Sequence, residues 1–362
     1  MASPPPPAGR GASFNPPNRF ERFHYQPEPD AADGDEELTV SPRTEFLLDA
    51  SRSIISYNDS PDVGFRAGVN PYRGCEHGCI YCYARPFHEH LGLSAGLDFE
   101  SKILVKPDAP ELLRQELASP RWQPQPIGLS GVTDCYQPIE RHLHLTRRCL
   151  QVLAEFRNPV VVVTKNRLVT RDRDYLGELA RHKAAAVYLS LTTLEEPLRR
   201  VMEPRTSTAA ARLEAIAELR QAGVPVGVLV APVIPGLNDH EIPSLLAAAA
   251  QAGAQFCGWT MLRLPWAVAD LFCDWLRRHF PDRQHKVLSR IRAVRGGRLN
   301  DSRFGSRMRG EGEIAQTIGR LFQLARRRAG LQQGCPELSV AAFRRPGPVQ
   351  KLLFPLGETP PE

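Results

Sequence analysis

Three cysteines stand within eight positions of one another in the stretch "NPYRGCEHGCIYCYARPFHEH". Cys75, Cys79 and Cys82 have the spacing C-x3-C-x2-C, and no fourth cysteine follows closely. In a reducing compartment, clustered cysteines bind metals or take part in catalysis more often than they form disulfides. The alternative, three small buried side chains, fits poorly with the charged residues and glycines between them. The spacing therefore predicts a metal centre.

Two kinds of metal centre fit the three thiols. A structural zinc site needs four ligands, and His77 or His88 would supply the fourth. The zinc hypothesis predicts a small non-enzymatic module that binds nucleic acid or protein, and it gives the long segment that follows no role. An iron–sulfur cubane takes thiolate ligands, and three of them leave one iron free to bind a substrate or cofactor.

An alternation of strands and helices from about residue 65 to 280 must position the cysteines. Apolar runs typical of buried strands alternate with amphipathic segments typical of helices. We expect strands within 101–106, 126–132, 159–166, 185–193, 224–236 and 254–265. This order predicts an α/β fold, either a doubly wound sheet or a partial TIM-like barrel. Both bind ligands at the carboxyl ends of the strands.

Composition divides the chain into three parts. Residues 1–60 are rich in proline and acidic residues, which predicts a mostly disordered extension, although the aromatic-containing segment 10–25 could pack against the body. Residues 61–280 are the predicted core domain, and residues 281–362 a basic helical extension with an irregular tail. No apolar run suits a membrane span or a secretion signal, so we expect a cytoplasmic protein.

The charge is concentrated near the C-terminus. Residues 283–328 hold thirteen Lys or Arg and three acidic residues, within a chain of net charge +6. Such a segment indicates a polyanionic partner such as nucleic acid. A solvated arginine-rich surface is the alternative.

The cysteine motif also carries a family resemblance. With Tyr81 before the last cysteine, ahead of the first helix of a β/α domain, it resembles the radical S-adenosylmethionine (SAM) superfamily. The stretches "GVTDCYQPIE", "LSLTTLEEPLRRVMEPR" and "APVIPGLND" resemble an uncharacterised bacterial group within it, similar to spore photoproduct lyase and often labelled DNA-repair-photolyase-like.

The resemblance implies a fold, two cofactors and a reaction. The fold is a partial (β/α)6 barrel, and Cys75, Cys79 and Cys82 ligate a [4Fe–4S] cluster whose fourth iron binds SAM. An electron from the cluster cleaves SAM to methionine and a 5′-deoxyadenosyl radical, which abstracts hydrogen from a substrate. Such an enzyme needs an electron donor such as flavodoxin or ferredoxin.

The resemblance places five residues near the adenine and the methionyl amino group. Tyr81 packs near adenine, and Val233 and Ile234 contact it from the fifth strand. Thr133 or Asp134 accepts a hydrogen bond from the ammonium, although this chain lacks the Gly-Gly-Glu-like segment of the family there. Packing in the core is the alternative for the apolar residues.

Four further residues are candidates for the ribose and carboxylate of SAM. Ser190 and Thr192 alternate onto one face at the end of a strand, where helix capping is the alternative. Arg205 has the planar guanidinium that suits a carboxylate, with Glu203 orienting it or holding a ribose hydroxyl. A surface ion pair is the alternative. Lys165 either faces the substrate or ends a strand.

Cys135 is the candidate catalytic thiol. It follows a strand at the expected barrel mouth, where it could return a hydrogen atom to a substrate radical. The alternative is an incidental half-buried cysteine.

The substrate stays open between nucleic acid and a peptide or small molecule, with the basic segment closing the barrel in the second case. The oligomeric state is not indicated.

Overall fold

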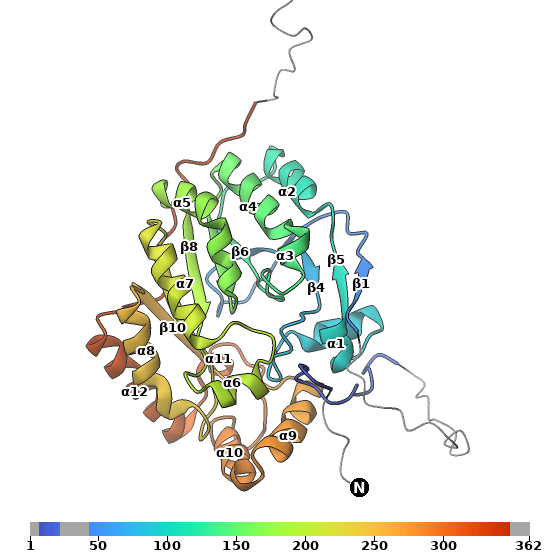
Figure 1. The fold of residues 1–362 in the computed structure, drawn as a ribbon, viewed down its shortest axis with the longest axis vertical. Helices are drawn as coiled ribbons and strands as arrows, with labels where there is room; N and C mark the ends of the chain where they lie inside the picture. Colours follow the sequence, from blue (N-terminus) through green and yellow to red (C-terminus); the bar gives the residue numbers. More distant parts are fainter. Residues whose placement is uncertain (1–6, 22–42, 348–362) are drawn as a thin grey trace, which may run out of the picture.

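The computed structural model describes residues 7–21 and 43–347. Its centre is an eight-stranded sheet in the order β11-β10-β9-β8-β7-β6-β3-β2 (Figure 1). Six parallel strands form its middle: β3 (Ala67–Val69), β6 (Ile127–Leu129), β7 (Val160–Thr164), β8 (Ala185–Ser190), β9 (Val226–Val233) and β10 (Phe256–Met261). This is the α/β fold of a partial barrel, as the sequence predicted.

The two edges of this sheet carry short flanking strands. β2 (Ile55–Tyr57) pairs antiparallel with β3, and β11 (Gln332–Gln333) pairs parallel with β10. The inner strands are continuous apolar runs because both their faces are buried, as "VVVVT" in β7 illustrates. The six parallel strands therefore all end on one side, where the loops that follow them can share a site.

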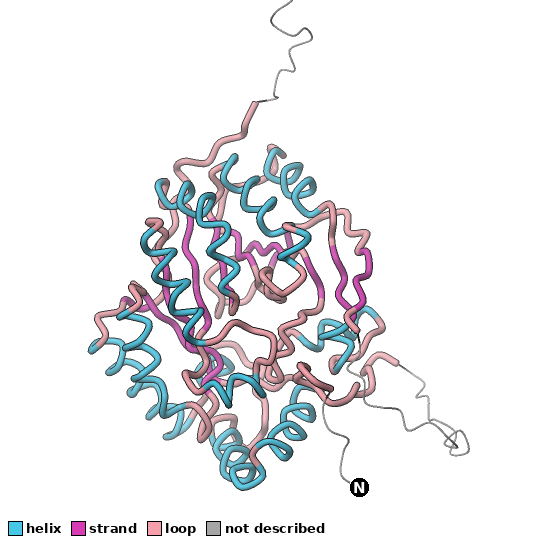
Figure 2. The backbone as a smooth tube through the Cα atoms, viewed as in Figure 1, coloured by secondary structure: helices cyan, strands magenta, loops and turns pink. Residues whose placement is uncertain are grey.

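Helices cover the outside of the sheet (Figure 2). They are α2 (Ala109–Ala118), α4 (Leu145–Phe156), α5 (Arg173–Arg181), α7 (Ala209–Gln221), α8 (Ile242–Gln251) and α12 (Gly312–Arg328). The predicted apolar stripe of α4, which includes Cys149, Leu153 and Phe156, is buried against the strands. Asp108 precedes α2 as predicted, but its side chain makes no capping hydrogen bond.

Further helices lie outside this layer. They are α1 (Leu97–Ser101), α3 (Glu140–Leu143), α6 (Glu196–Met202), α9 (Ala267–His279), α10 (Pro281–Ala293) and α11 (Ser306–Arg309), with 3-10 turns η2 (Arg85–Leu91), η3 (Arg167–Asp172) and η4 (Asp239–Glu241). In the described residues, none of the helices has the length and apolar character that crossing a membrane requires.

A second sheet lies beside the barrel and corrects one sequence expectation. β1 (Glu45–Leu48), β5 (Lys102–Val105) and β4 (Tyr72–Arg73) form it, so the strand predicted within 101–106 exists but does not belong to the barrel. The first barrel strand is β3, which was not predicted because three residues are too short to show a period.

Parts of residues 1–60, which the sequence analysis predicted to be a mostly disordered extension, are folded against the rest of the protein. Residues 7–21 pack beside α1 and α9, where Figure 1 shows them in dark blue, and residues 43–60 contain β1 and β2. The backbone N–H groups of Gly11 and Ala12 each donate to the buried Glu100 carboxylate at 2.9 Å. The acidic run at 30–37 lies outside the described residues.

The C-terminal extension joins the two edges of the barrel. Arg309 donates to the carbonyl of Trp259 in β10 at 2.6 Å. On the other side, Arg307 pairs with Asp62 at 2.6 Å, and the Gly305 N–H donates to the same carboxylate at 3.0 Å. Asp62 lies in the turn between β2 and β3, so residues 305–309 bridge the seam between the first and last barrel strands.

Candidate functional site

The three cysteines lie in the loop that follows β4, beside the carboxyl ends of the barrel strands. Cys75 and Cys79 are buried and Cys82 is half-buried. The Ile80 N–H donates to the Met202 carbonyl at 3.1 Å, which ties this loop to the end of α6. The backbone of His77 contacts the Cys75 thiol, and the backbone of Ala84 and Arg85 contacts the Cys82 thiol. In the described part of the chain none of the three cysteines forms a disulfide, so all three thiols remain available to a metal centre.

Two glycines shape this loop. Gly74 and Gly78 have φ angles of +80° and +66°, in the left-handed region that side chains disfavour. A Cβ on Gly78 would lie 2.7 Å from a Glu100 carboxylate oxygen, and one on Gly74 would lie 2.9 Å from the His88 ring. Both positions therefore need glycine for conformation and for space.

The arrangement does not support the zinc hypothesis. A tetrahedral zinc site holds its sulfurs within about 4 Å of one another. Across residues 7–21 and 43–347, the three thiols and nearby histidines contain no group of three ligand atoms within 4.8 Å. His88 is buried against the Lys102 carbonyl at 2.9 Å, and burial lowers its pKa to about 4. Thiols spaced more widely suit a cubane, in which each cysteine binds a different iron.

Burial also decides the charge of the thiols. It raises the pKa of Cys75, Cys79 and Cys82, because a thiolate loses its hydration there. A bound cluster would reverse this preference, since a coordinating thiol is deprotonated. The donor set thus fits an iron–sulfur cluster.

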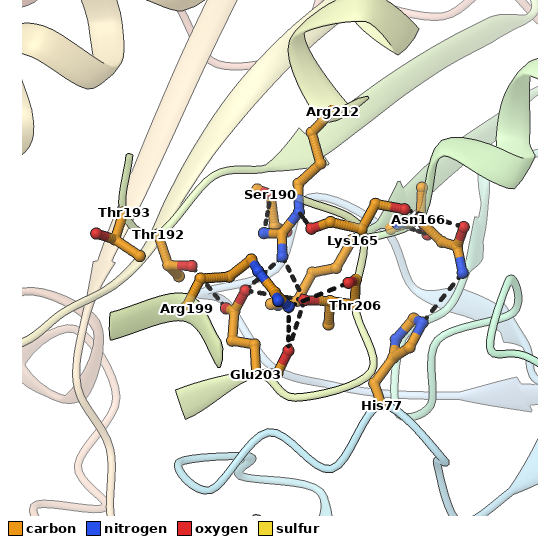
Figure 3. A network of polar contacts seen from close by, with 12 residues as sticks. His77, Lys165, Asn166, Ser190, Thr192, Thr193, Arg199, Glu203, Thr206 and Arg212 are labelled. Atoms are coloured by element: carbon orange, nitrogen blue, oxygen red, sulfur yellow. Dashed lines mark hydrogen bonds and ion pairs between the residues drawn. The ribbon is translucent and has the colours of Figure 1, made fainter. Parts of the chain in front are cut away.

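Glu203 is the centre of a buried network beside the cysteine loop (Figure 3). Its carboxylate accepts hydrogen bonds from the Tyr81 hydroxyl, from the Thr192 hydroxyl at 2.6 Å and from Arg212 at 2.5 Å. Burial alone would raise the pKa of Glu203, but Arg212 and Lys165 lower it to about 2. Glu203 is therefore a carboxylate that joins the cluster loop to β8 and α7.

This network corrects the predicted partner of Glu203. The sequence suggested that Glu203 orients Arg205, whereas its ion-pair partner is Arg212, at 2.5 Å. The Arg205 guanidinium instead donates to the Gly9 carbonyl at 3.0 Å and lies 3.8 Å from Glu76. Arg212 was missed because it lies inside the helix α7, where the sequence gives no sign that this arginine is buried and not on the surface.

Asp134 links the ends of two strands to the cysteine loop. It accepts from the Thr164 hydroxyl at 2.7 Å and from the Lys165 N–H at 2.8 Å, and it lies 3.3 Å from the His77 ring. Burial would raise its pKa, but His77 and these hydrogen bonds lower it to about 2. Both carboxylate oxygens already have protein partners, so Asp134 positions His77 and β7; its contact with the SAM ammonium stays a prediction.

Lys165 projects toward the cysteines from the end of β7. Its ammonium lies 5.8 Å from the centre of the Tyr81 ring. Burial would lower its pKa, but the nearby Cys79 and Glu203 raise it. Within the described residues this ammonium has no hydrogen-bond or ion-pair partner, which leaves it free to bind an anion.

The other predicted SAM residues are divided between the site and the core. Ile234 shares an apolar cluster with Cys79 and Tyr81, whereas Val233 packs in the barrel core. The Thr133 hydroxyl donates to the Tyr72 carbonyl at 2.9 Å. Ser190 is buried, and its carbonyl accepts from Arg212. Their contacts with SAM stay predictions.

Asn238 is a positioning residue that the sequence analysis did not single out. Its side chain donates to the Thr192 carbonyl at 2.8 Å and accepts from the Ile234 N–H at 2.7 Å. It thereby fixes two predicted SAM residues on adjacent strands. Its place within "PGLND", beside two turn-forming residues, was the signal that could have found it.

Cys135 lies in the apolar core together with Tyr136 and Cys149, and its side chain is fully buried. Its N–H donates to Ser130 at 2.6 Å. The complete burial of this side chain is closer to the alternative prediction of an incidental cysteine, although that alternative expected it to be only half-buried. Its role as a hydrogen donor stays a prediction.

Comparison with known families accounts for this arrangement. The family model of the radical SAM superfamily matches residues 69–249, a range that holds all three cysteines, Lys165 and Glu203. The chain belongs to the radical SAM superfamily. Members carry a [4Fe–4S] cluster and SAM, and they need a reductant. This chain is therefore a radical SAM enzyme.

The relatives found by sequence lack an assigned function, with one exception. An uncharacterized protein of Mycobacterium tuberculosis is 37% identical over 232 residues, which cover 64% of this chain and 67% of the relative. A Methanocaldococcus jannaschii protein, also uncharacterized, is 29% identical over 184 residues, 51% of this chain and 66% of the relative. A protein of Pseudomonas phage M6 named "Radical SAM Nalpha-GlyT isomerase" is 27% identical over 48% of this chain and 34% of its own length.

Among solved structures, spore photoproduct lyase complexed with dinucleoside spore photoproduct has a TM-score of 0.57. The match covers 80% of this chain and 81% of that one at 15% sequence identity. At this identity the likeness establishes a shared fold and leaves the substrate open.

Proposed function

We propose that this protein reductively cleaves SAM at a [4Fe–4S] cluster on Cys75, Cys79 and Cys82 and uses the 5′-deoxyadenosyl radical to abstract hydrogen from a substrate. The observation that carries this proposal is a set of three free cysteines in one loop, close to a buried cation and a buried carboxylate at the carboxyl end of a barrel. When bound, the reduced cluster supplies the electron that breaks the carbon–sulfur bond of SAM.

The side chains around the cysteines suggest how SAM is held. Lys165 has the unpaired ammonium that a carboxylate needs, and this role replaces the one predicted for Arg205. Tyr81 and Ile234 provide apolar surface for adenine. Glu203 keeps the Tyr81 ring in place through its hydroxyl. The side chains proposed to bind SAM are thus already held in position by the protein before SAM binds.

A nucleic-acid substrate is the finer part of the proposal. Its support is the basic segment 283–328 and the likeness to proteins whose names refer to a dinucleoside and to GlyT. The second candidate is a peptide or small molecule, favoured by the observation that residues 305–309 bridge the barrel seam instead of extending as a free platform. Cytoplasmic location and a flavodoxin or ferredoxin donor complete the proposal.

An anaerobic assay for 5′-deoxyadenosine tests the reaction. The protein is reconstituted with iron and sulfide, reduced with dithionite and supplied with SAM. We expect product from the wild type, none from C79A, and wild-type yield from C335A, a cysteine far along the chain from the motif. Zinc at one atom per chain, with no product after reconstitution, would overturn the proposal.

A further inference from the structure

One arginine at the barrel mouth lacks a counter-charge. Arg263 follows the carboxyl end of β10 by two residues. Its Nε atom is buried without a hydrogen-bond partner, and in residues 7–21 and 43–347 its guanidinium forms no ion pair. The guanidinium carbon instead lies 5.4 Å from the centre of the Tyr83 ring. Arg263 is half-buried, and a guanidinium partly removed from water is normally paired, so this arrangement suits an anion.

The charges around Arg263 do not supply that anion. Burial lowers its pKa, and the positive charge of Arg307 lowers it further. The nearby carboxylate of Asp62 is already bound by Arg307 at 2.6 Å and by the Gly305 N–H. Arg295, also buried here, donates to the Leu262 carbonyl at 2.5 Å. The surroundings of Arg263 are therefore cationic, and the carboxylate of Asp62, which acts on it, is already engaged by other groups.

The position of Arg263 connects it to the cluster site. Tyr83 directly follows the cluster ligand Cys82, and its side chain is 44% exposed. The Tyr83 hydroxyl donates to the Gly131 carbonyl at the end of β6, at 2.7 Å. A molecule bound to the guanidinium over this ring would lie beside Tyr83, the residue that follows the cluster ligand Cys82.

We propose that Arg263 binds a phosphodiester group of the substrate at the barrel mouth. A guanidinium matches phosphate oxygens in a bidentate way. The exposed Tyr83 ring beside it offers a stacking surface for a base. A phosphodiester is favoured over a carboxylate because the adjoining segment 283–328 carries thirteen basic residues against three acidic ones. The inference rests on the proposed function and names the substrate class of that same site.

Binding to the reconstituted holoenzyme tests the site without turnover. The probes are the dinucleotide dTpdT, its uncharged methylphosphonate analogue and inorganic phosphate, measured by equilibrium dialysis with SAM present and no reductant. We expect the wild type to prefer dTpdT over the analogue by about tenfold, since a charge-assisted hydrogen bond contributes about 1.5–3 kcal/mol. R263Q should lose that preference. R298Q, which removes an exposed arginine of the same extension, should retain it.

Each other outcome overturns the site. Equal loss in R263Q and R298Q would indicate diffuse attraction by the basic extension. Weaker SAM binding in R263Q would assign Arg263 to the cofactor. Competition by inorganic phosphate at the dTpdT concentration would indicate a free phosphate site. The 5′-deoxyadenosine assay is separate: a wild type that binds dTpdT with the expected preference but forms no product would refute the proposed reaction and leave the anion site standing.

Discussion

Glu203 carries its charge without contact with water and depends on neighbouring side chains for compensation. We expect E203Q to lower the free energy of unfolding of the apoprotein by about 3–5 kcal/mol, because Arg212 would be left as an uncompensated buried charge. Urea unfolding followed by circular dichroism measures this loss. E195Q, at an exposed carboxylate, is the matched control and should change stability little. Equal losses in the two variants would contradict the network.

The same carboxylate predicts how stability depends on pH. The pKa of Glu203 is lowered from 4.5 to about 2 in the folded protein. A group with a lowered folded pKa contributes stability above its unfolded pKa and loses it as pH falls toward the folded value. We therefore expect the contribution to be complete at neutral pH and to decline from about pH 4.5 to about pH 2. Urea midpoints across this range should fall more steeply in wild type than in E203Q.

Single residues were predicted from the sequence with uneven success. The cysteines were found because metal ligands in one loop have a recognisable spacing. The partner of Glu203 was missed because Arg212 reaches it from a helix nine positions along the chain, and charge pairing across a buried space leaves no local pattern. For Cys135 the sequence left open a catalytic thiol at the barrel mouth or an incidental half-buried cysteine, and local sequence could not show that the side chain is fully buried in the core.

At the scale of elements, the N-terminal segment 7–21 supports the cysteine loop. A Cβ on Gly11 would lie 1.9 Å from the Gly78 carbonyl oxygen, in the middle of that loop. We expect G11A to displace the segment and the loop together and to reduce the iron retained after reconstitution to less than about half of the wild-type value. G64A, where a Cβ meets open space, is the control. Iron analysis and the visible absorption of the cluster measure the effect.

If G11A retained as much iron as the wild type, the cysteine loop would not depend on residues 7–21 for its conformation. A second readout separates this effect from general misfolding, since the thermal midpoint of apo-G11A should stay close to that of apo-G64A.

Long elements were predicted more reliably than short ones. The helix pattern of α4 and the continuous apolar run of β7 are determined by burial on one or both faces, which the sequence displays. β3 and β4 have three and two residues, and pairing with distant strands creates them. For the same reason β5 could not be assigned to its own small sheet from local sequence.

For the whole molecule, the contact between Asp62 and Arg307 holds the seam of the barrel closed. We expect D62N to loosen residues 304–309. The asparagine side chain can still accept a hydrogen bond, but it has no charge and therefore cannot form the ion pair with Arg307. Hydrogen–deuterium exchange should rise several-fold in that segment and in the turn around residue 62. D59N changes an exposed aspartate of the same turn and should leave exchange unaltered.

Unchanged exchange in D62N would mean that other contacts, such as the one between Arg309 and the Trp259 carbonyl, are enough to hold the extension. The partial barrel could be predicted from sequence, but this closure could not, because it joins residues 245 positions apart.

The packing of residues 7–21 also constrains the order in which the molecule can be completed. Ser13 donates to Asp274 in α9 at 2.7 Å, across 261 positions of sequence. Translation must therefore pass Asp274 before this contact can form. The hydrogen bonds from Gly11 and Ala12 to Glu100 span only 89 and 88 positions, and they hold the same segment beside Gly78. The segment can therefore dock beside the cysteine loop before the barrel is complete, whereas its contact with α9 must wait for the later strands.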